Sequence, residues 1–144
     1  MSDFSPLGTE RSKLESLGED ELFANLAQSR PEIAAQLGVA AHPQGAFLDR
    51  EEILGQMHAA GLWDDIVARG KAVFNQVWNE AQGAVCAVYA ELAQSGSLGE
   101  LLDEAAKAVA TLLGLPGRVA YLVARAAIKA GLDRLCGMKA MPVQ

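Results

Sequence analysis

Apolar residues recur with helical spacing over residues 62–94, and this is the strongest pattern in the chain. Successive apolar or small positions lie three or four residues apart, at Trp63, Val67, Gly70, Phe74, Val77, Ala81, Val85, Val88 and Leu92. This period predicts one face of a single long α-helix. Trp78 and Tyr89 widen this face, and its large side chains form a candidate apolar stripe, made of Trp63, Phe74, Val77, Trp78 and Tyr89.

Shorter helices are predicted before this segment. A helical pattern begins at Glu10 and is interrupted at Gly18. It resumes with three consecutive acids, residues 19–21, which suit the positive end of a helix dipole. Pro31 fits the first position of the next helix, and Gly38 is a typical stop.

A loop is predicted over residues 39–48, with a turn at Pro43 to Gly45. Asp49 then has Glu52 three residues later, which is the pattern of a capping box at a helix start. We expect the helix that follows to end at Gly61.

Residues 98–136 predict an apolar helical hairpin. Ser97, followed by Glu100, favours another capped start, residues 114–117 favour a turn, and the last helix is expected from Arg118 to Leu135. From residue 105 to residue 124 only Lys107 and Arg118 are charged. A helix that is apolar around most of its circumference is buried in protein or in lipid. Neither arm offers 18 uninterrupted apolar residues, so neither is a typical membrane span.

Together these elements predict an all-α protein: a single compact bundle of five to seven helices with the C-terminal hairpin at its centre. We assign residues 10–137 to one domain, flanked by a flexible N-terminus (1–9) and a flexible C-terminal tail (138–144). The chain has 144 residues, of which 51% are hydrophobic, and this is enough to bury a core without cross-links.

The charge is unevenly distributed. Residues 1–104 carry 17 acidic and 6 basic side chains, whereas residues 105–144 carry 1 acidic and 6 basic side chains. Arg118, Tyr121, Arg125 and Lys129 lie along one side of the last helix as a candidate basic stripe for a lipid or a partner. The overall charge of −6 opposes binding to nucleic acid.

The two cysteines are too few to indicate a disulfide framework. Cys86 lies within an apolar helical pattern and predicts a buried free thiol. Cys136 lies near the end of the last helix and has no CxxC partner, and its reactivity stays open. No signal peptide or lipidation motif is recognisable, so the chain is expected to be cytoplasmic.

No motif indicates catalysis, a cofactor or a metal. His42 and His58 have no second ligand at the spacing that places two side chains on one helix face. The adjacent acid pairs at 51–52 and 64–65 suit helix starts better than catalytic dyads. We therefore expect neither enzymatic activity nor a cofactor.

Three hypotheses for the function remain. The first is a non-enzymatic protein-interaction module that binds a protein partner or itself, as a homo-oligomer. The second is a membrane-active protein that applies the apolar, basic hairpin (98–136) to an anionic membrane surface. The third is a carrier of a small apolar ligand, whose cavity would be lined by the aromatic residues of the candidate apolar stripe.

Overall fold

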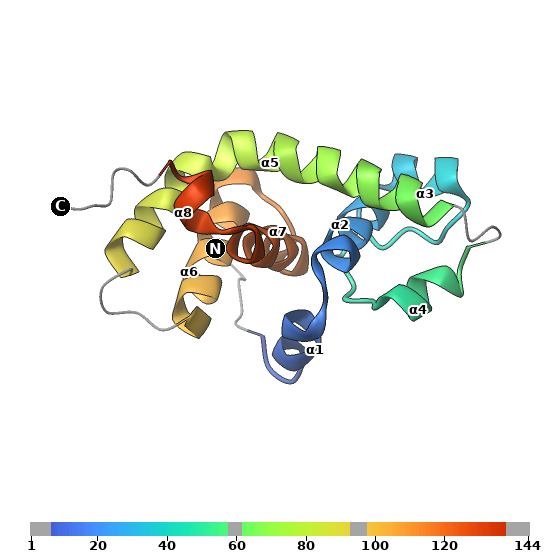
Figure 1. The fold of residues 1–144 in the computed structure, drawn as a ribbon, viewed down its shortest axis with the longest axis horizontal. Helices are drawn as coiled ribbons and strands as arrows, with labels where there is room; N and C mark the ends of the chain where they lie inside the picture. Colours follow the sequence, from blue (N-terminus) through green and yellow to red (C-terminus); the bar gives the residue numbers. More distant parts are fainter. Residues whose placement is uncertain (1–6, 58–61, 93–97, 138–144) are drawn as a thin grey trace.

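The protein is all-α, as a computed structural model that describes residues 7–57, 62–92 and 98–137 shows (Figure 1). Within these ranges the chain forms eight helices and no strand. They are α1 (Glu10–Ser16), α2 (Glu19–Gln28), α3 (Pro31–Leu37), α4 (Arg50–Leu54), α5 (Leu62–Leu92), α6 (Leu98–Leu113), α7 (Gly117–Ala130) and α8 (Leu132–Leu135). The predicted fold class is confirmed.

Helix α7 lies at the centre of the bundle, as predicted for the C-terminal hairpin. Every residue from Val119 to Ala124 is buried, and α7 packs against α1, α2, α5, α6 and α8. Helix α6 packs on both α5 and α7 but buries one face only, so Leu112 on its outer side is 54% exposed. Most apolar side chains of the hairpin therefore lie in the core.

Helix α2 is buried more completely than the sequence indicates. All residues from Leu22 to Ser29 are buried, because α2 lies between α5 and α7. The approach of α2 to α5 depends on Gly70: a Cβ atom there would lie 1.6 Å from the backbone oxygen of Phe23. Among the helices that precede α5, α2 therefore belongs to the core.

Several predicted boundaries are confirmed. Pro31 is the first residue of α3, and Gly38 ends that helix in the left-handed conformation. Asp49 and Glu52 form the predicted capping box: each carboxylate accepts the other residue's backbone N–H at 2.8 Å. The long α5 helix begins at Leu62, as predicted.

Two boundaries differ from the prediction and raise the number of helices above seven. The helix capped by Asp49 ends at Leu54 rather than at Gly61. The last helix breaks at Gly131, whose φ of 104° is outside the helical region, and so divides into α7 and α8. The predictions for residues 1–6, His58, the cap at Ser97 and the tail 138–144 lie outside the described residues.

The prediction of a free thiol at Cys86 is wrong. Cys86 on α5 and Cys136 after α8 form a disulfide, with their Cα atoms 5.7 Å apart and 50 positions apart in sequence. A hydrogen bond from Gln82 Nε2 to the carbonyl of Leu135 (3.0 Å) joins the same two elements. The pairing was not predicted because it depends on α8 folding back along α5, which the spacing of two cysteines does not reveal.

Candidate functional site

Two arginines of the candidate basic stripe on α7 contact α1. Arg118 forms an ion pair with Glu10, and Arg125 Nη2 donates to the backbone carbonyl of Glu15 at 3.3 Å. Lys129 is exposed on the last turn of the helix. In this conformation the two arginines are held by α1 rather than presented together to an outside surface.

Tyr121 is the buried member of this stripe. It is 1% exposed, and its hydroxyl donates to Asp103 Oδ1 at 2.6 Å, the same carboxylate oxygen that Arg11 contacts at 2.5 Å. Burial and the hydrogen bond to Asp103 raise the pKa of Tyr121 to about 12. Its ring therefore contributes to the core, and its hydroxyl joins α7 to α6.

The candidate apolar stripe on α5 is mainly core. Trp63, Phe74, Val77 and Trp78 are each more than nine-tenths buried, while Tyr89 is half-buried. Phe74 stacks on Trp78 with ring centroids 6.0 Å apart and meets Phe23 edge-on at 5.7 Å. These side chains fill space by packing on one another, which gives no support to the carrier hypothesis.

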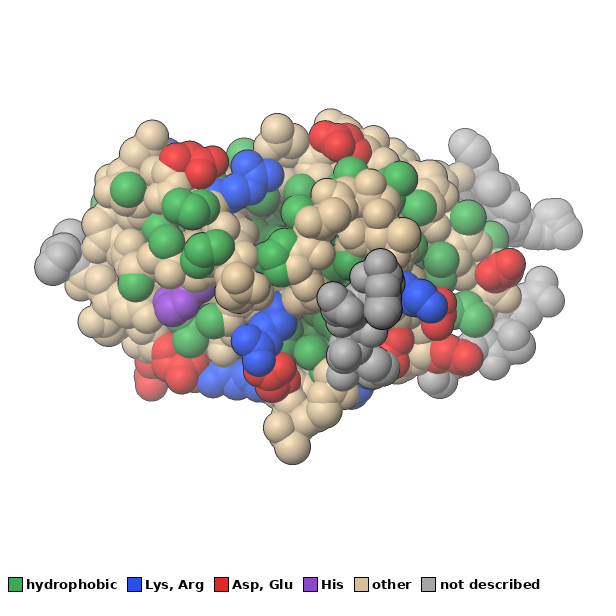
Figure 2. Space-filling model, turned by 180° about the vertical axis from the view of Figure 1, so that it is seen from behind, with side chains coloured by type: hydrophobic (Ala, Val, Ile, Leu, Met, Phe, Trp, Pro, Cys, Tyr) green, Lys and Arg blue, Asp and Glu red, His purple; other side chains and the backbone are tan. Residues whose placement is uncertain are grey.

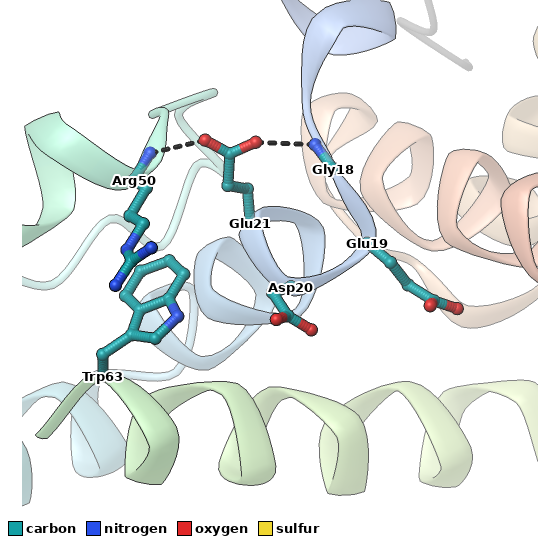
Figure 3. Close-up of a pocket in the computed structure, with 6 residues that line it drawn as sticks. All are labelled: Gly18, Glu19, Asp20, Glu21, Arg50 and Trp63. Atoms are coloured by element: carbon teal, nitrogen blue, oxygen red, sulfur yellow. Dashed lines mark hydrogen bonds between the residues drawn. The ribbon is translucent and has the colours of Figure 1, made fainter.

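A different site lies where α2, α4 and α5 begin. An open pocket of about 420 Å³ is lined there by Gly18, Glu19, Asp20, Glu21, Arg50 and Trp63 (Figure 3). The residues come from three stretches of sequence, and the start of each helix contributes one part of the wall. The acids are typical of helix starts and Trp63 is a member of the candidate apolar stripe, and neither pattern reveals that they meet.

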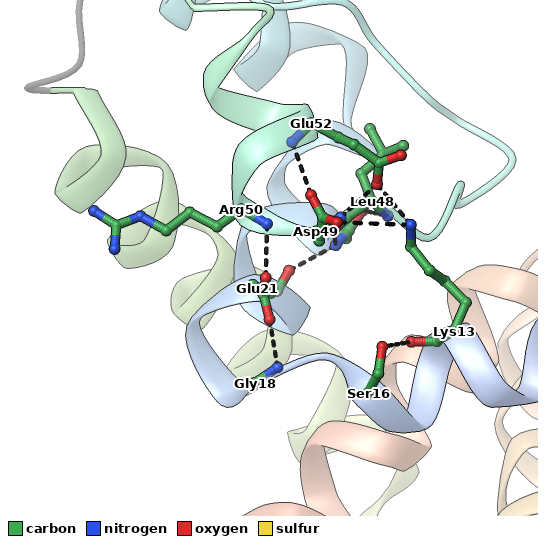
Figure 4. A network of polar contacts seen from close by, with 9 residues as sticks. Lys13, Ser16, Gly18, Glu21, Leu48, Asp49, Arg50 and Glu52 are labelled. Atoms are coloured by element: carbon green, nitrogen blue, oxygen red, sulfur yellow. Dashed lines mark hydrogen bonds and ion pairs between the residues drawn. The ribbon is translucent and has the colours of Figure 1, made fainter.

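Glu21 fixes the geometry of this pocket. One of its carboxylate oxygens accepts the backbone N–H of Gly18, and the other accepts the backbone N–H of Arg50, both at 2.6 Å (Figure 4). One side chain therefore satisfies donors at the starts of two helices, where backbone N–H groups have no partner within the helix. This bridge holds α4 against α2.

Behind the pocket, buried amides fasten the loop 39–48 to α2. Asn25 is 2% exposed, and its amide donates to the carbonyl of Leu48 at 2.8 Å and accepts from the N–H of Leu48 at 3.0 Å. Gln28 is fully buried and donates to the carbonyl of Ala40 at 2.9 Å. Buried polar groups need such partners, so the amides define where the loop and α4 lie.

The pocket carries charged side chains of both signs that form no ion pair with a described residue. The Arg50 guanidinium lies over the Trp63 ring, 5.3 Å from its centroid. Glu19 and Asp20 are exposed, and neither forms an ion pair with any residue that the structure describes. Glu10, Glu52 and Asp103 each contact a basic side chain, whereas the exposed acids Glu80, Glu91 and Glu104 also form no ion pair with a described residue.

The surface carries no large continuous apolar area on the face shown in Figure 2, where hydrophobic side chains are separated by polar groups and backbone. Among the described residues, no group of three or more His, Cys, Asp or Glu side chains is placed to hold a metal ion. None of the helices, over the residues described, is long and apolar enough to cross a membrane.

Comparison with known proteins adds no relative: no family model, no curated protein and no solved structure matches this chain.

Proposed function

We propose that this protein is a non-enzymatic interaction module that binds a partner protein through its acidic end. The acidic end consists of the exposed carboxylates at the starts of α2, α4 and α5: Glu19, Asp20, Glu51, Asp64 and Asp65. The observation that carries the proposal is that these side chains form no ion pair within the described residues, although three helix starts meet there.

Unpaired charges of one sign favour a partner of the opposite sign, because complementary potentials accelerate encounter and disfavour wrong partners. The acids also stabilise their own helix starts through the helix dipole. That intramolecular role leaves their outer oxygens in solvent and available to a basic partner surface.

These observations fit a different protein as the partner better than a second copy of this chain. Self-association through an apolar face would need a sizeable exposed apolar area, and Leu112 is the large hydrophobic residue that stands out as exposed in the described chain. Self-association through charge gains little from the basic stripe, because Arg118 and Arg125 already contact α1. Light scattering of the purified protein tests the predicted homo-oligomer directly.

The binding experiment compares two variants with equal net charge. Glu19→Gln/Asp20→Asn alters the acidic end, and Glu80→Gln/Glu91→Gln alters exposed acids nearer the other end of α5. Tagged proteins are incubated with an extract of the native cells at low and physiological salt. We expect a partner that the wild type and the α5 variant retain and the acidic-end variant loses. Equal retention by both variants would contradict the proposal.

Membrane association of the hairpin is a second proposal, and it rests on the uncharged stretch 119–124 of α7, which is buried in the folded protein and would reach lipid only after release. Release would have to separate α7 from α1 and α2. The disulfide joins α8 to α5, so the hairpin 98–136 stays attached to the end of α5 while the bond is intact. We expect sedimentation with anionic liposomes only after reduction. Absence of lipid binding in the reduced protein would end this proposal.

The cytoplasmic location stays a prediction. The disulfide weighs against it, because such bonds persist in oxidising compartments and are rare in the cytosol. The protein can be isolated from its native cells while free thiols are trapped. Its mass then shows whether Cys86 and Cys136 are bonded or free.

A further inference from the structure

Helix α8 is joined to α5 by side-chain links rather than by close packing. It is four residues long (Leu132–Leu135) and packs on α7, with Leu132 only 4% exposed. The links to α5 that the described residues show are two hydrogen bonds and one covalent bond. They are Gln82 to the carbonyl of Leu135, Tyr89 to Asp133, and the disulfide from Cys86 to Cys136, directly after α8.

The two hydrogen bonds are poor substitutes for the disulfide. Both lie in exposed surroundings, where water competes for the same donors and acceptors and leaves little net stabilisation. Helix α6 differs, because Leu102, Ala105 and Val109 are buried in the core. Loss of the disulfide therefore affects the junction of α8 with α5 before it affects the packing of α6.

The chain has a place to bend at the end of α7. Gly131 lies between α7 and α8 with a φ of 104°, a conformation that glycine adopts readily. Leu132, the next residue, stays in the core, whereas Asp133, Arg134 and Gly137 are exposed. The segment 133–137 can therefore leave α5 without drawing Leu132 out of the core.

The disulfide itself lies at the edge of the core. Cys86 and Cys136 are half-buried, and Ala87 and Gly137, which follow them in sequence, are exposed. Thiol–disulfide exchange requires a thiolate to reach one of the two sulfurs, and access helps to set its rate. Partial exposure gives a soluble thiol a route to this bond while the core stays folded.

We propose that the disulfide is a redox switch that controls the attachment of segment 133–137 to α5. The co-reactant is a dithiol. One of its thiolates attacks Sγ of one cysteine, the S–S bond breaks, and the other cysteine leaves as a thiolate that takes up a proton. The second thiol of the reductant then displaces the remaining cysteine, so that two electrons and two protons pass to the protein and the reductant becomes a disulfide.

This inference goes beyond the proposed function, because it concerns control of one end of the fold rather than binding at the acidic end. In the oxidised state segment 133–137 lies against α5. In the reduced state it leaves α5 and uncovers Tyr89 and the Cys86 thiol, while the core around α2 and α7 keeps its packing.

The test reduces the full-length folded protein with dithiothreitol in native buffer, without denaturant. Free thiols are alkylated and counted by mass, the near-ultraviolet circular dichroism of the buried Trp63 and Trp78 reports on the core, and hydrogen exchange of residues 131–137 reports on α8. We expect two free thiols, an unchanged tryptophan signal and loss of protection over 131–137. Oxidation with glutathione disulfide should restore the protection.

Two variants separate the disulfide from the hydrogen bonds. Cys86→Ser/Cys136→Ser should show rapid exchange over residues 131–137 with or without dithiothreitol. Gln82→Ala removes the hydrogen bond to Leu135 but keeps the disulfide, so it should stay protected when oxidised and lose protection when reduced. If the double serine variant fails to fold, reduced and alkylated wild type takes its place.

Three results would each overturn the proposal. The bond could resist dithiothreitol until urea unfolds the chain, the tryptophan signal could be lost together with the bond, or residues 131–137 could stay protected after reduction. The first two would make the disulfide a purely structural cross-link, and the third would mean that the hydrogen bonds suffice. None of these results depends on whether the acidic end captures a partner.

Discussion

The two halves of α5 belong to one unbroken helix but are held by different interactions. In the first half, residues 62–81, a buried side chain recurs at almost every turn, and α2 crosses at Gly70 with its backbone almost in contact. In the second half, residues 82–92, only Val85 is fully buried. That half is fastened by the Cys86–Cys136 disulfide, by Gln82 and by a hydrogen bond from Tyr89 to Asp133.

The two ends differ in what gathers around them. The end of α5 that is held by packing lies beside the pocket, where exposed carboxylates from the starts of three helices gather. The other end carries a covalent cross-link and side-chain bonds between α5 and α8. We infer that the first end is the interacting end and the second is structural, and four perturbations test how each is held.

Loss of the disulfide should have the largest effect. The bond closes a loop of about 50 residues that contains α6 and α7, so removing it restores about 4 kcal/mol of chain entropy to the unfolded state. Chemical unfolding of Cys86→Ala/Cys136→Ala, compared with wild type, measures this loss. The same change seen on reduction of the wild type is the control, and a loss below about 1 kcal/mol would mean that the bond stabilises little.

Gly70→Ala should destabilise by about 3 kcal/mol, because a methyl group at 1.6 Å from the Phe23 oxygen forces α2 and α5 apart. Gly83→Ala is the matched control on the same helix. A Cβ there meets nothing within 4 Å, so alanine should stabilise by about 0.5–1 kcal/mol through helix propensity. Equal effects of the two substitutions in urea unfolding would refute the proposed difference between the halves.

Asn25→Ala should lower the free energy of unfolding by about 2 kcal/mol. It leaves the partly buried N–H and carbonyl of Leu48 without their partner and so loosens the loop that carries α4. Thermal unfolding measures the loss. Asn75→Ala, an exposed position on α5, should change stability far less, and a similar cost at both positions would contradict the role given to Asn25.

The smallest expected effect is a pH dependence at the start of α4. The hydrogen bond from Lys13 and the N–H of Asp49 lower the pKa of Glu52. A lowered folded-state pKa gives stability that is present above the ordinary glutamate pKa of about 4.3 and is lost as pH falls through the folded value. Urea unfolding at pH 7 and pH 3 should show a smaller loss in Glu52→Gln than in wild type. Glu51→Gln should resemble wild type.

The sequence predicted those parts of the fold that depend on neighbouring residues. Periodicity located α5, and the cap at Asp49 with Glu52 located the start of α4. The burial of residues 119–124 in α7 followed from the absence of charged residues over that stretch. What the sequence did not reveal depends on contacts between distant segments, as for Cys86 with Cys136 and for Glu21 with the N–H of Arg50.

The candidate site was missed for the same reason. Its acids are typical of a helix first turn, and Trp63 is a regular member of the α5 stripe. Only the position of α4, set by Glu21 and Asn25, brings Arg50 over Trp63 and opens a pocket beside Asp20.

Hydrogen exchange along α5, measured by mass spectrometry in the oxidised and the reduced protein, shows whether its two halves are held by different interactions. Amides from residue 66 to residue 81 should exchange slowly in both states, because packing against α2 protects them. Amides from residue 82 to residue 92 should be protected in the oxidised protein and exchange much faster after reduction. Equal acceleration along the whole helix would contradict this difference, because it would mean that the two halves of α5 open as one unit.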